Sequence, residues 1–204
     1  LFSNSDFAAA GPPGPGELKL LEPFRAQLPS EVFGPPYRPP RTDTGPSALR
    51  ENLKRARELL EQAGWKVDPN GILRNAKGEP FEFEYLETQG GSQFRTVTWQ
   101  RNLAKLGITM RARTVDFALY RKRLEAFDFD VITIRTPDFA LPSAIDYVET
   151  LGSKTADVTG SGNFRGLKDP AVDAMLAAMT EARTYAELRD ASRALDRIVT
   201  HRHY

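Results

Sequence analysis

The sequence predicts an α/β fold, a three-layer lobe with a small, mainly parallel βαβαβ sheet flanked by helices. Residues 81–85 alternate apolar and acidic side chains (Phe-Glu-Phe-Glu-Tyr), which is typical of a half-buried strand. Between residues 92 and 134, two helix-like segments alternate with two further strand-like runs. Because a strand–helix–strand unit joins parallel strands by a right-handed crossover, this alternation predicts a parallel sheet.

The composition excludes several classes of function. The chain has 204 residues with a formal net charge of +1, too small a charge to indicate binding to nucleic acid or to an anionic membrane surface. It has no cysteine, so neither a disulfide framework nor a thiolate site is available. No apolar run approaches the roughly 20 residues that span a bilayer.

The first 45 residues are rich in proline and also carry apolar patches in "ELKLLEPF" and "EVFGPPY". Long connections without secondary structure are uncommon in compact domains. Because the apolar side chains need burial, we expect an extended segment that packs on a larger body. A flexible tail is the alternative.

From Pro46 onward the chain becomes periodic. Residues 46–63 repeat apolar side chains every three or four positions, which predicts a helix ending at Gly64. Turn residues at 68–71 and 75–78 then predict a small hairpin that leads into the strand of residues 81–86.

The alternating part follows. Ser92 and Asp116 are predicted to cap two helices, and residues 108–115 to form the strand between them. The side chains expected to face inward are Phe94, Val97, Leu103 and Leu106 in the first helix, and Phe117, Tyr120, Leu124 and Phe127 in the second. The next strand, residues 131–134, must end before Pro137, because proline lacks a backbone donor.

Two helices are predicted to close the chain. Asp169 with Pro170 is a typical helix start, and Thr184 with Glu187 has the spacing of a capping box. We expect both helices to cover the sheet.

The sequence offers little support for catalysis or for a metal or cofactor site. His201 and His203 are the only histidines, and two positions apart on a helix they point to different sides. Asp128 and Asp130 could form a carboxylate pair, but a solvated strand start is the favoured interpretation. No catalytic residue, metal ligand or cofactor is predicted.

Asp138 lies where a ligand site is expected. Ligands of open parallel sheets bind outside the carboxyl ends of the strands, and Asp138 follows the strand of residues 131–134. Its carboxylate could pair with a ligand ammonium, and Phe139 offers an apolar contact. The residues alone leave a second interpretation equally open, in which Asp138 caps a helix over the following residues.

Several stretches resemble the C-terminal lobe of bacterial extracellular solute-binding proteins of family 5, the peptide and nickel receptors of ABC importers. They are "ARELLEQAGW", "NGILRNAKGEPFEFEYL", "WQRNLAKLGITMRARTVDFALYRKRLEAFDFDVI" and "GNFRGLKDPAVDAML". They occur in the family's order and cover most of residues 46–200. The opening residues look most like the branch that takes up oligopeptides and microcin C-like peptides.

The resemblance implies a type II periplasmic-binding-protein-like lobe of a two-lobed clamshell. Residues 46–204 would form this lobe, truncated at its end, and residues 1–45 would pack on an N-terminal lobe outside the chain. The signal peptide would also be outside the chain. The full-length protein would be a periplasmic monomer that binds an oligopeptide or peptide-like ligand and delivers it to a membrane-embedded ABC permease with its ATPase subunits.

The resemblance also implies site residues. In peptide-binding members an acid after this strand takes the peptide α-amino group, and "DFALP" supplies Asp138 and Phe139 in that context. Arg135 and Thr136 replace the usual glycine and tryptophan, and Arg135 would favour an acidic ligand group. Asn163 matches a recurrent family asparagine, which more often holds its loop than touches ligand.

Two alternatives remain beside this interpretation. One is a carboxylate-dependent hydrolase that would use Asp138 with Glu87 or Asp146 as acid and base. The other is a nickel or haem receptor of the same family, because the fold is shared. The terminal histidines do not favour a nickel site.

Overall fold

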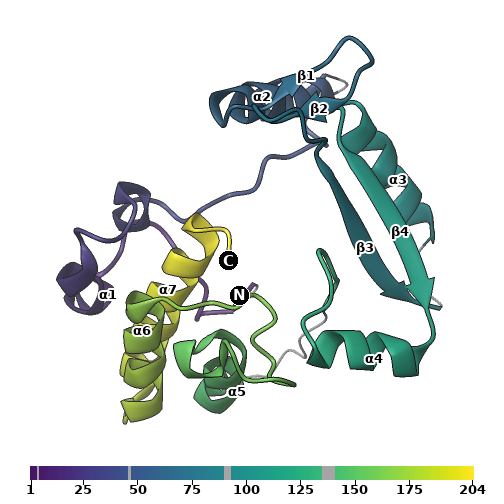
Figure 1. Ribbon diagram of the computed structural model, residues 1–204. Helices are drawn as coiled ribbons and strands as arrows, with labels where there is room; N and C mark the ends of the chain where they lie inside the picture. Colours follow the sequence, from purple (N-terminus) through teal and green to yellow (C-terminus); the bar gives the residue numbers. More distant parts are fainter. Residues whose placement is uncertain (4, 46, 90–92, 135–140) are drawn as a thin grey trace. The chain divides into compact units, whose positions relative to one another are not determined.

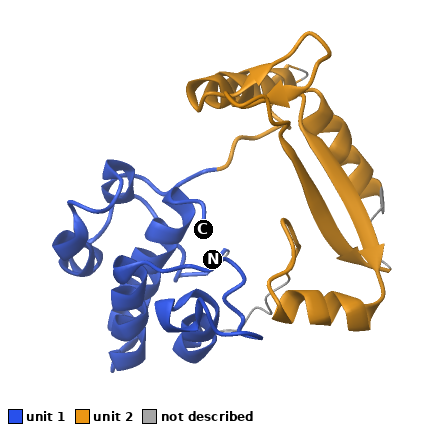
Figure 2. Ribbon diagram, in the orientation of Figure 1, with its two compact units in different colours: residues 1–38, 136–204 blue, residues 39–135 orange. Residues whose placement is uncertain are grey.

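The computed structural model describes residues 1–3, 5–45, 47–89, 93–134 and 141–204. The chain divides into two compact units, coloured separately in Figure 2. Unit 1 comprises residues 1–38 and 136–204, and unit 2 comprises residues 39–135. The expected division at residue 45 differs from this one, because unit 1 combines the start of the chain with its end.

The sheet of unit 2 is parallel. Strands β3 (Glu82–Thr88) and β4 (Thr109–Val115) pair in register from Glu82 opposite Thr109 to Thr88 opposite Val115 (Figure 1). Helix α3 (Gln93–Ala104) joins the two strands, and α4 (Phe117–Glu125) follows β4. A third chain segment pairs with the other side of β3 at Val131, which forms a parallel bridge with Tyr85. The predicted mixed α/β fold with a parallel sheet is confirmed.

Helices flank both faces of this sheet. Strand alternation places Phe83 and Tyr85 on one face, where their rings lie 6.3 and 5.5 Å from the Trp99 ring of α3. The opposite face is charged, and Arg123 of α4 binds Glu84 there at 2.7 Å. Asp116 caps α4 as predicted, since its side chain accepts a hydrogen bond from the Leu119 N–H.

Helix α2 (Ala48–Gln62) and the hairpin of β1 (Lys66–Val67) and β2 (Leu73–Arg74) lie at the amino ends of β3 and β4 (Figure 1). They share a small core with Leu73, Leu106 and Ile108. Gly107 has a φ of +80°, and a Cβ there would lie 2.7 Å from the Gly71 oxygen. Glycine therefore allows this turn to approach the hairpin closely.

Unit 1 is helical in the residues that the structure describes. It consists of α1 (Pro15–Leu21), α5 (Ala144–Leu151), α6 (Pro170–Glu181), α7 (Tyr185–His201) and the short 3₁₀ turns Glu22–Phe24, Ser30–Phe33 and Ser153–Thr155. The predicted helix starts at Asp169 and Thr184 are confirmed. We expected the apolar faces of α6 and α7 to cover the sheet, and this expectation is wrong. Both helices bury these faces in the core of unit 1, whereas the sheet belongs to unit 2.

The first 38 residues are partly helical and contribute to the core of unit 1. Phe2, Phe7, Leu21, Leu28 and Val32 are buried together with side chains of α6 and α7. The segment is therefore not simply extended: its apolar patches find burial within the chain. Whether it also packs on a further lobe stays a prediction.

Arg197 of α7 binds residues 1–38 through several hydrogen bonds. Its side chain is fully buried, and its Nε donates to Glu17 at 2.6 Å. The guanidinium also donates to the backbone oxygens of Gly34 and Gly11, both at 2.8 Å. The hydrogen-bond acceptors of this buried cation in the described chain are a carboxylate and carbonyl oxygens, the partners that a buried guanidinium requires.

Candidate functional site

The carboxyl ends of the parallel strands form one edge of unit 2, and this edge is the candidate ligand site. Thr88 ends β3 opposite Val115, which ends β4, and the Gln89 N–H donates to the Val115 oxygen at 3.3 Å. The predicted convergence of strand ends is confirmed for these two strands. Loops that leave such an edge are the usual ligand-binding positions of open parallel sheets.

The segment from Val131 points toward the same edge. The Leu86 N–H donates to the Val131 oxygen at 2.9 Å, and the Val131 N–H donates to the Glu84 oxygen at 3.1 Å. The Tyr85 hydroxyl and the Thr133 hydroxyl are 2.9 Å apart and form a hydrogen bond. These contacts align residues 131–133 in parallel with β3, although only Val131 makes a strand bridge.

Two carboxylates at this edge already have hydrogen-bond partners. Glu87 accepts from the Thr96 hydroxyl at 3.2 Å and from the Thr114 hydroxyl at 3.4 Å. Asp116 serves as the cap of α4. Both side chains therefore help to position the elements that carry the edge.

Two phenylalanines near the edge are exposed, contrary to prediction. Phe94 in the first turn of α3 is 84% exposed, and Phe117 in the first turn of α4 is 67% exposed. The inward face of α3 instead carries Thr96 and Gln100, whose side chains bind Glu87 and the Met110 oxygen. The prediction is confirmed for Leu103 and Leu106, which pack in the core, and is wrong for Phe94 and Val97, which are exposed. Apolar periodicity missed Thr96 and Gln100 because these side chains are polar and hydrogen-bonded.

Four predicted site residues, Arg135, Thr136, Asp138 and Phe139, lie outside the described residues. Their assignment stays a prediction from the sequence. The structure does describe what precedes them, a segment that is parallel to β3 and directed toward the carboxyl edge. Ser143, which follows them, caps α5 by accepting from the Asp146 N–H.

Asn163, the fifth predicted residue, is fully buried in the loop before α6. Its Nδ2 donates to the oxygens of Gly152 and Leu167 at 3.0 and 3.1 Å, and its Oδ1 accepts from the Leu167 N–H at 3.0 Å. These bonds support the loop-holding role that the sequence favoured. Contact between Asn163 and a ligand stays a prediction.

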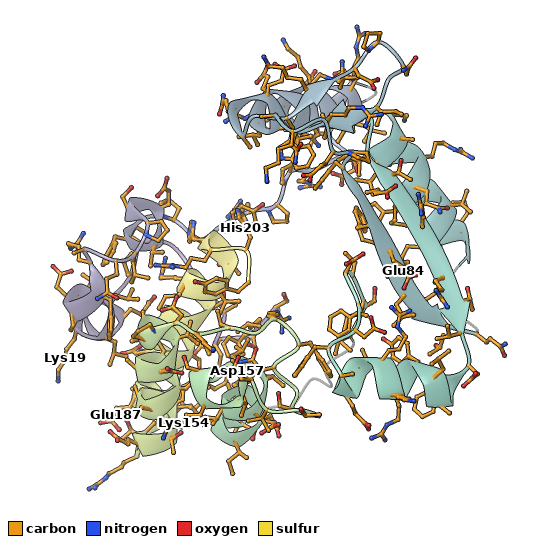
Figure 3. All side chains as sticks on the ribbon, viewed as in Figure 1. Lys19, Glu84, Lys154, Asp157, Glu187 and His203 are labelled. Atoms are coloured by element: carbon orange, nitrogen blue, oxygen red, sulfur yellow. The ribbon has the colours of Figure 1, made fainter. Side chains whose placement is uncertain are left out.

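Asp128 and Asp130 are exposed, as the predicted solvated strand start requires, but both also make hydrogen bonds. Asp130 accepts from the Glu84 N–H at 2.8 Å, and Asp128 accepts from Arg123 Nε at 2.9 Å. Glu84, labelled in Figure 3, holds the other side of this guanidinium. Glu84, and to a lesser extent Asp128, raise the pKa of Arg123 above its usual value. Asp130 thus bonds the segment that precedes Val131 directly to β3, and Asp128 does so through Arg123 and Glu84.

Neither a metal cluster nor a membrane span emerges from the described ranges. They contain no group of three or more His, Asp or Glu side chains arranged to hold a metal ion. They also contain no helix with the length and apolarity to cross a bilayer. His201 and His203 both lie against the Tyr37 ring, at centroid distances of 6.0 and 4.8 Å.

The fold is that of a type II periplasmic-binding-protein-like lobe, which solved structures share. The family model "Bacterial extracellular solute-binding proteins, family 5 Middle" matches residues 24–158. The match spans more than half of the chain, and the chain therefore belongs to this family. Its members are binding proteins located outside the cytoplasm.

Two curated relatives agree with this assignment. A probable peptide-binding protein, YejA, of Agrobacterium fabrum is 35% identical over 198 residues, which is 97% of this chain and 32% of the relative. A putative binding protein of Brucella melitensis is 37% identical over 199 residues, again 97% of this chain and 32% of the relative. The chain thus spans about a third of the length of these relatives.

A solved structure shares the fold. It is the oligopeptide-binding protein AppA from Bacillus subtilis, solved in complex with a nonapeptide. The match covers 72% of this chain and 30% of the AppA chain. The TM-score is 0.60 at 21% sequence identity. At this identity the likeness is evidence for the fold alone.

Proposed function

We propose that the chain is part of the substrate-binding component of an ABC importer that takes up oligopeptides. The observation that carries this proposal is the parallel strand edge of unit 2, in a chain that belongs to the solute-binding family and whose relative is named a probable peptide-binding protein. Backbone groups of the loops that follow the strand ends can pair with those of a peptide, and water-filled pockets tolerate varied side chains.

The residues after Ile134 would supply the specific contacts. In this proposal the Asp138 carboxylate binds the α-amino group of the peptide by a charge-assisted hydrogen bond. Phe139 gives an apolar contact, and Arg135 with Thr136 receives an acidic or polar ligand group. These residues belong directly after the segment that Val131 aligns with β3.

The proposal also includes a second lobe and a membrane transporter, both outside this chain. The full-length protein would be a periplasmic monomer whose second lobe closes over the ligand by hinge motion. It would then deliver the peptide to a membrane-embedded permease with ATPase subunits. The hydrolase alternative is not favoured, because the family is one of binding proteins and Glu87 is engaged by two threonine hydroxyls. A nickel or haem ligand has no support from the described residues.

The ligand class can be tested on the full-length protein. Native mass spectrometry of the protein purified from cells should detect co-purified peptides, and finding only a metal chelate or a sugar would overturn the proposal. Asp138→Ala should weaken peptides with a free N-terminus by about tenfold or more, and N-acetylated peptides much less, because one charge-assisted bond is lost. Calorimetry measures both affinities.

A matched control is Asp157→Ala, which removes an exposed carboxylate that pairs with Lys168 in the loop before α6. This variant should bind both kinds of peptide like the wild type. Equal weakening of free and acetylated peptides by Asp138→Ala would contradict the amine-binding role while leaving peptide binding itself intact.

A further inference from the structure

The groove between α2 and the turn after α3 is a second candidate surface, distinct from the ligand edge. It has a volume of about 790 Å³, and its floor is apolar, with half-buried Leu49 and Leu53 of α2 and buried Leu106. Leu106 precedes β4, so the groove lies at the amino ends of the strands. Figure 1 shows α2 at the end of the sheet opposite the arrowheads.

The rim of this groove is strongly basic. Arg50, Lys54 and Arg57 stand at helical spacings of four and three on α2, next to the leucine stripe, and Lys105 faces them from the turn after α3. Among the described residues that line the groove, Glu51 is the only acid. Four cations and one carboxylate therefore surround an apolar floor.

These cations are not neutralised within the part of the chain that the structure describes. Arg50, Lys54, Arg57 and Lys105 make no ion pair there, whereas Arg55, at a different position around α2, pairs with Glu58 at 3.4 Å. Arg57 donates to the Lys105 backbone oxygen at 2.9 Å, and Lys105 Nζ donates to Asn102 at 3.1 Å. These bonds position two of the cations without cancelling their charge.

We propose that this groove docks a segment of the importer's permease that carries carboxylates beside an apolar side chain. The proposal rests on the proposed function, which supplies the partner, and on charge complementarity, since an acidic segment would meet four cations. Burial favours a protein segment over a bilayer: Leu106 is buried and Leu49 and Leu53 are half-buried, so an apolar side chain has to enter the groove to contact them. The ligand edge at the other end of β3 and β4 stays open during docking.

Charge reversal in the full-length protein tests the assignment. We compare Arg50→Glu with Lys54→Glu combined in one variant against Lys77→Glu with Lys122→Glu in a control that changes the net charge equally. Lys77 lies in the turn after β2 and Lys122 on α4, both exposed and outside the groove. Binding to the cognate permease–ATPase complex in nanodiscs is measured by interferometry, together with peptide-stimulated ATPase activity.

The groove variant should dock about tenfold more weakly, or worse, while the control stays within about twofold of the wild type. Docking of the wild type should also weaken as salt is raised, because exposed charges are screened. Peptide affinity, measured by calorimetry, should be the same in all three proteins. Equal docking of the groove variant and the control would overturn the assignment of the groove and leave the proposed function standing.

A photocrosslinking residue in place of Arg50 identifies the occupant. We expect crosslinks to a permease segment that contains at least two Asp or Glu residues. Crosslinks to another part of the same protein or to a neutral segment would overturn the proposal, and so would binding of the wild type to anionic phosphatidylglycerol vesicles that the groove variant loses. A wild type that neither binds peptide nor stimulates the ATPase would instead refute the proposed function, and this inference with it.

Discussion

Asn163 shows how one polar residue can organise a loop. Its amide satisfies two acceptors and one donor on the backbone, namely the oxygens of Gly152 and Leu167 and the Leu167 N–H, in a position without solvent exposure. The Gly152 oxygen also accepts from the Thr155 N–H and hydroxyl, whereas the Leu167 N–H and oxygen depend on Asn163. A buried backbone group that loses its partner costs about 1–3 kcal/mol. The side chain therefore joins the end of α5 to the approach to α6.

Asn163→Asp should destabilise the protein by about 3 kcal/mol at pH 7, because a buried carboxylate would face two carbonyl oxygens and leave the Leu167 oxygen without its donor. Burial beside these oxygens would raise the pKa of the new carboxyl. Protonation at lower pH restores one donor, so the deficit relative to the wild type should shrink between pH 7 and pH 5. Urea unfolding at the two pH values measures it.

Asn70→Asp is the control, since Asn70 is exposed in the turn between β1 and β2. It should change the free energy of unfolding by less than about 0.5 kcal/mol. If Asn163→Asp left stability unchanged but weakened ligand binding, the loop-holding role would be contradicted and direct contact with ligand favoured.

Helix starts were predictable because capping is local. Thr184 and Glu187 lie three residues apart, and the structure shows both halves of the box. Glu187 accepts from the N–H groups of Arg183 and Thr184 at 2.9 and 3.1 Å, and these bonds lower its pKa. Asp116 and Asp169 are N-cap residues like Thr184, because their side chains accept from backbone N–H groups in the first turn of α4 and α6.

The capping box should give α7 a defined pH dependence. Because the folded-state pKa of Glu187 is lowered, its contribution to stability is fully present above the unfolded pKa near 4.3 and is lost as the pH falls through the lowered folded value. Glu187→Gln should therefore be less stable than the wild type at pH 7, and the difference should shrink toward pH 3. Thermal unfolding across this range measures it.

Glu181→Gln removes a nearby exposed carboxylate without touching the box and serves as the control. It should keep the pH dependence of the wild type. A constant difference between wild type and Glu187→Gln at every pH would show that the carboxylate charge does not contribute to the cap.

Inward faces of helices were less predictable than their starts. The sequence pointed Phe94 and Phe117 inward, yet both are exposed. The core-facing side of α3 includes Thr96 and Gln100, which are tolerated there because their polar groups find partners on β3 and β4. Such partners come from other elements, so apolar periodicity within one helix cannot reveal them.

At the scale of the whole molecule, the two units have separate cores. The core of unit 1 joins α6 and α7 to residues 1–38, and the core of unit 2 gathers around Leu73, Leu106 and Ile108. The buried pair of Arg197 and Glu17 connects the two ends of the chain within unit 1. Regions with separate cores can open independently.

Arg197→Met should lower the stability of unit 1 by about 3–5 kcal/mol, because it leaves the Glu17 carboxylate buried without its partner. Hydrogen exchange should accelerate in residues 5–38 and in α7, while β3 and β4 keep their protection. Mass spectrometry of exchanged peptides resolves these regions. Equal acceleration in the sheet would show that the two units unfold together.

Arg193→Met is the matched control on the same helix. Arg193 also reaches the N-terminal segment, through Asp6 at 2.6 Å, but that pair is partly exposed. Its loss should cost less than about 1 kcal/mol. Comparable losses from both variants would mean that burial of the Arg197 pair adds nothing.

The sequence by itself determined the α/β class, the parallel order of the strands and the helix caps, because alternation, helical spacing and capping depend on neighbours a few residues apart. Only the tertiary structure decided that the first 38 residues pack on α7, that α6 and α7 pack in unit 1, and that Lys105 joins the three cations of α2 around the groove. These outcomes depend on contacts between residues far apart in the chain, such as Glu17 with Arg197. Local patterns show that a side chain needs burial or a partner, and the folded chain decides which surface supplies it.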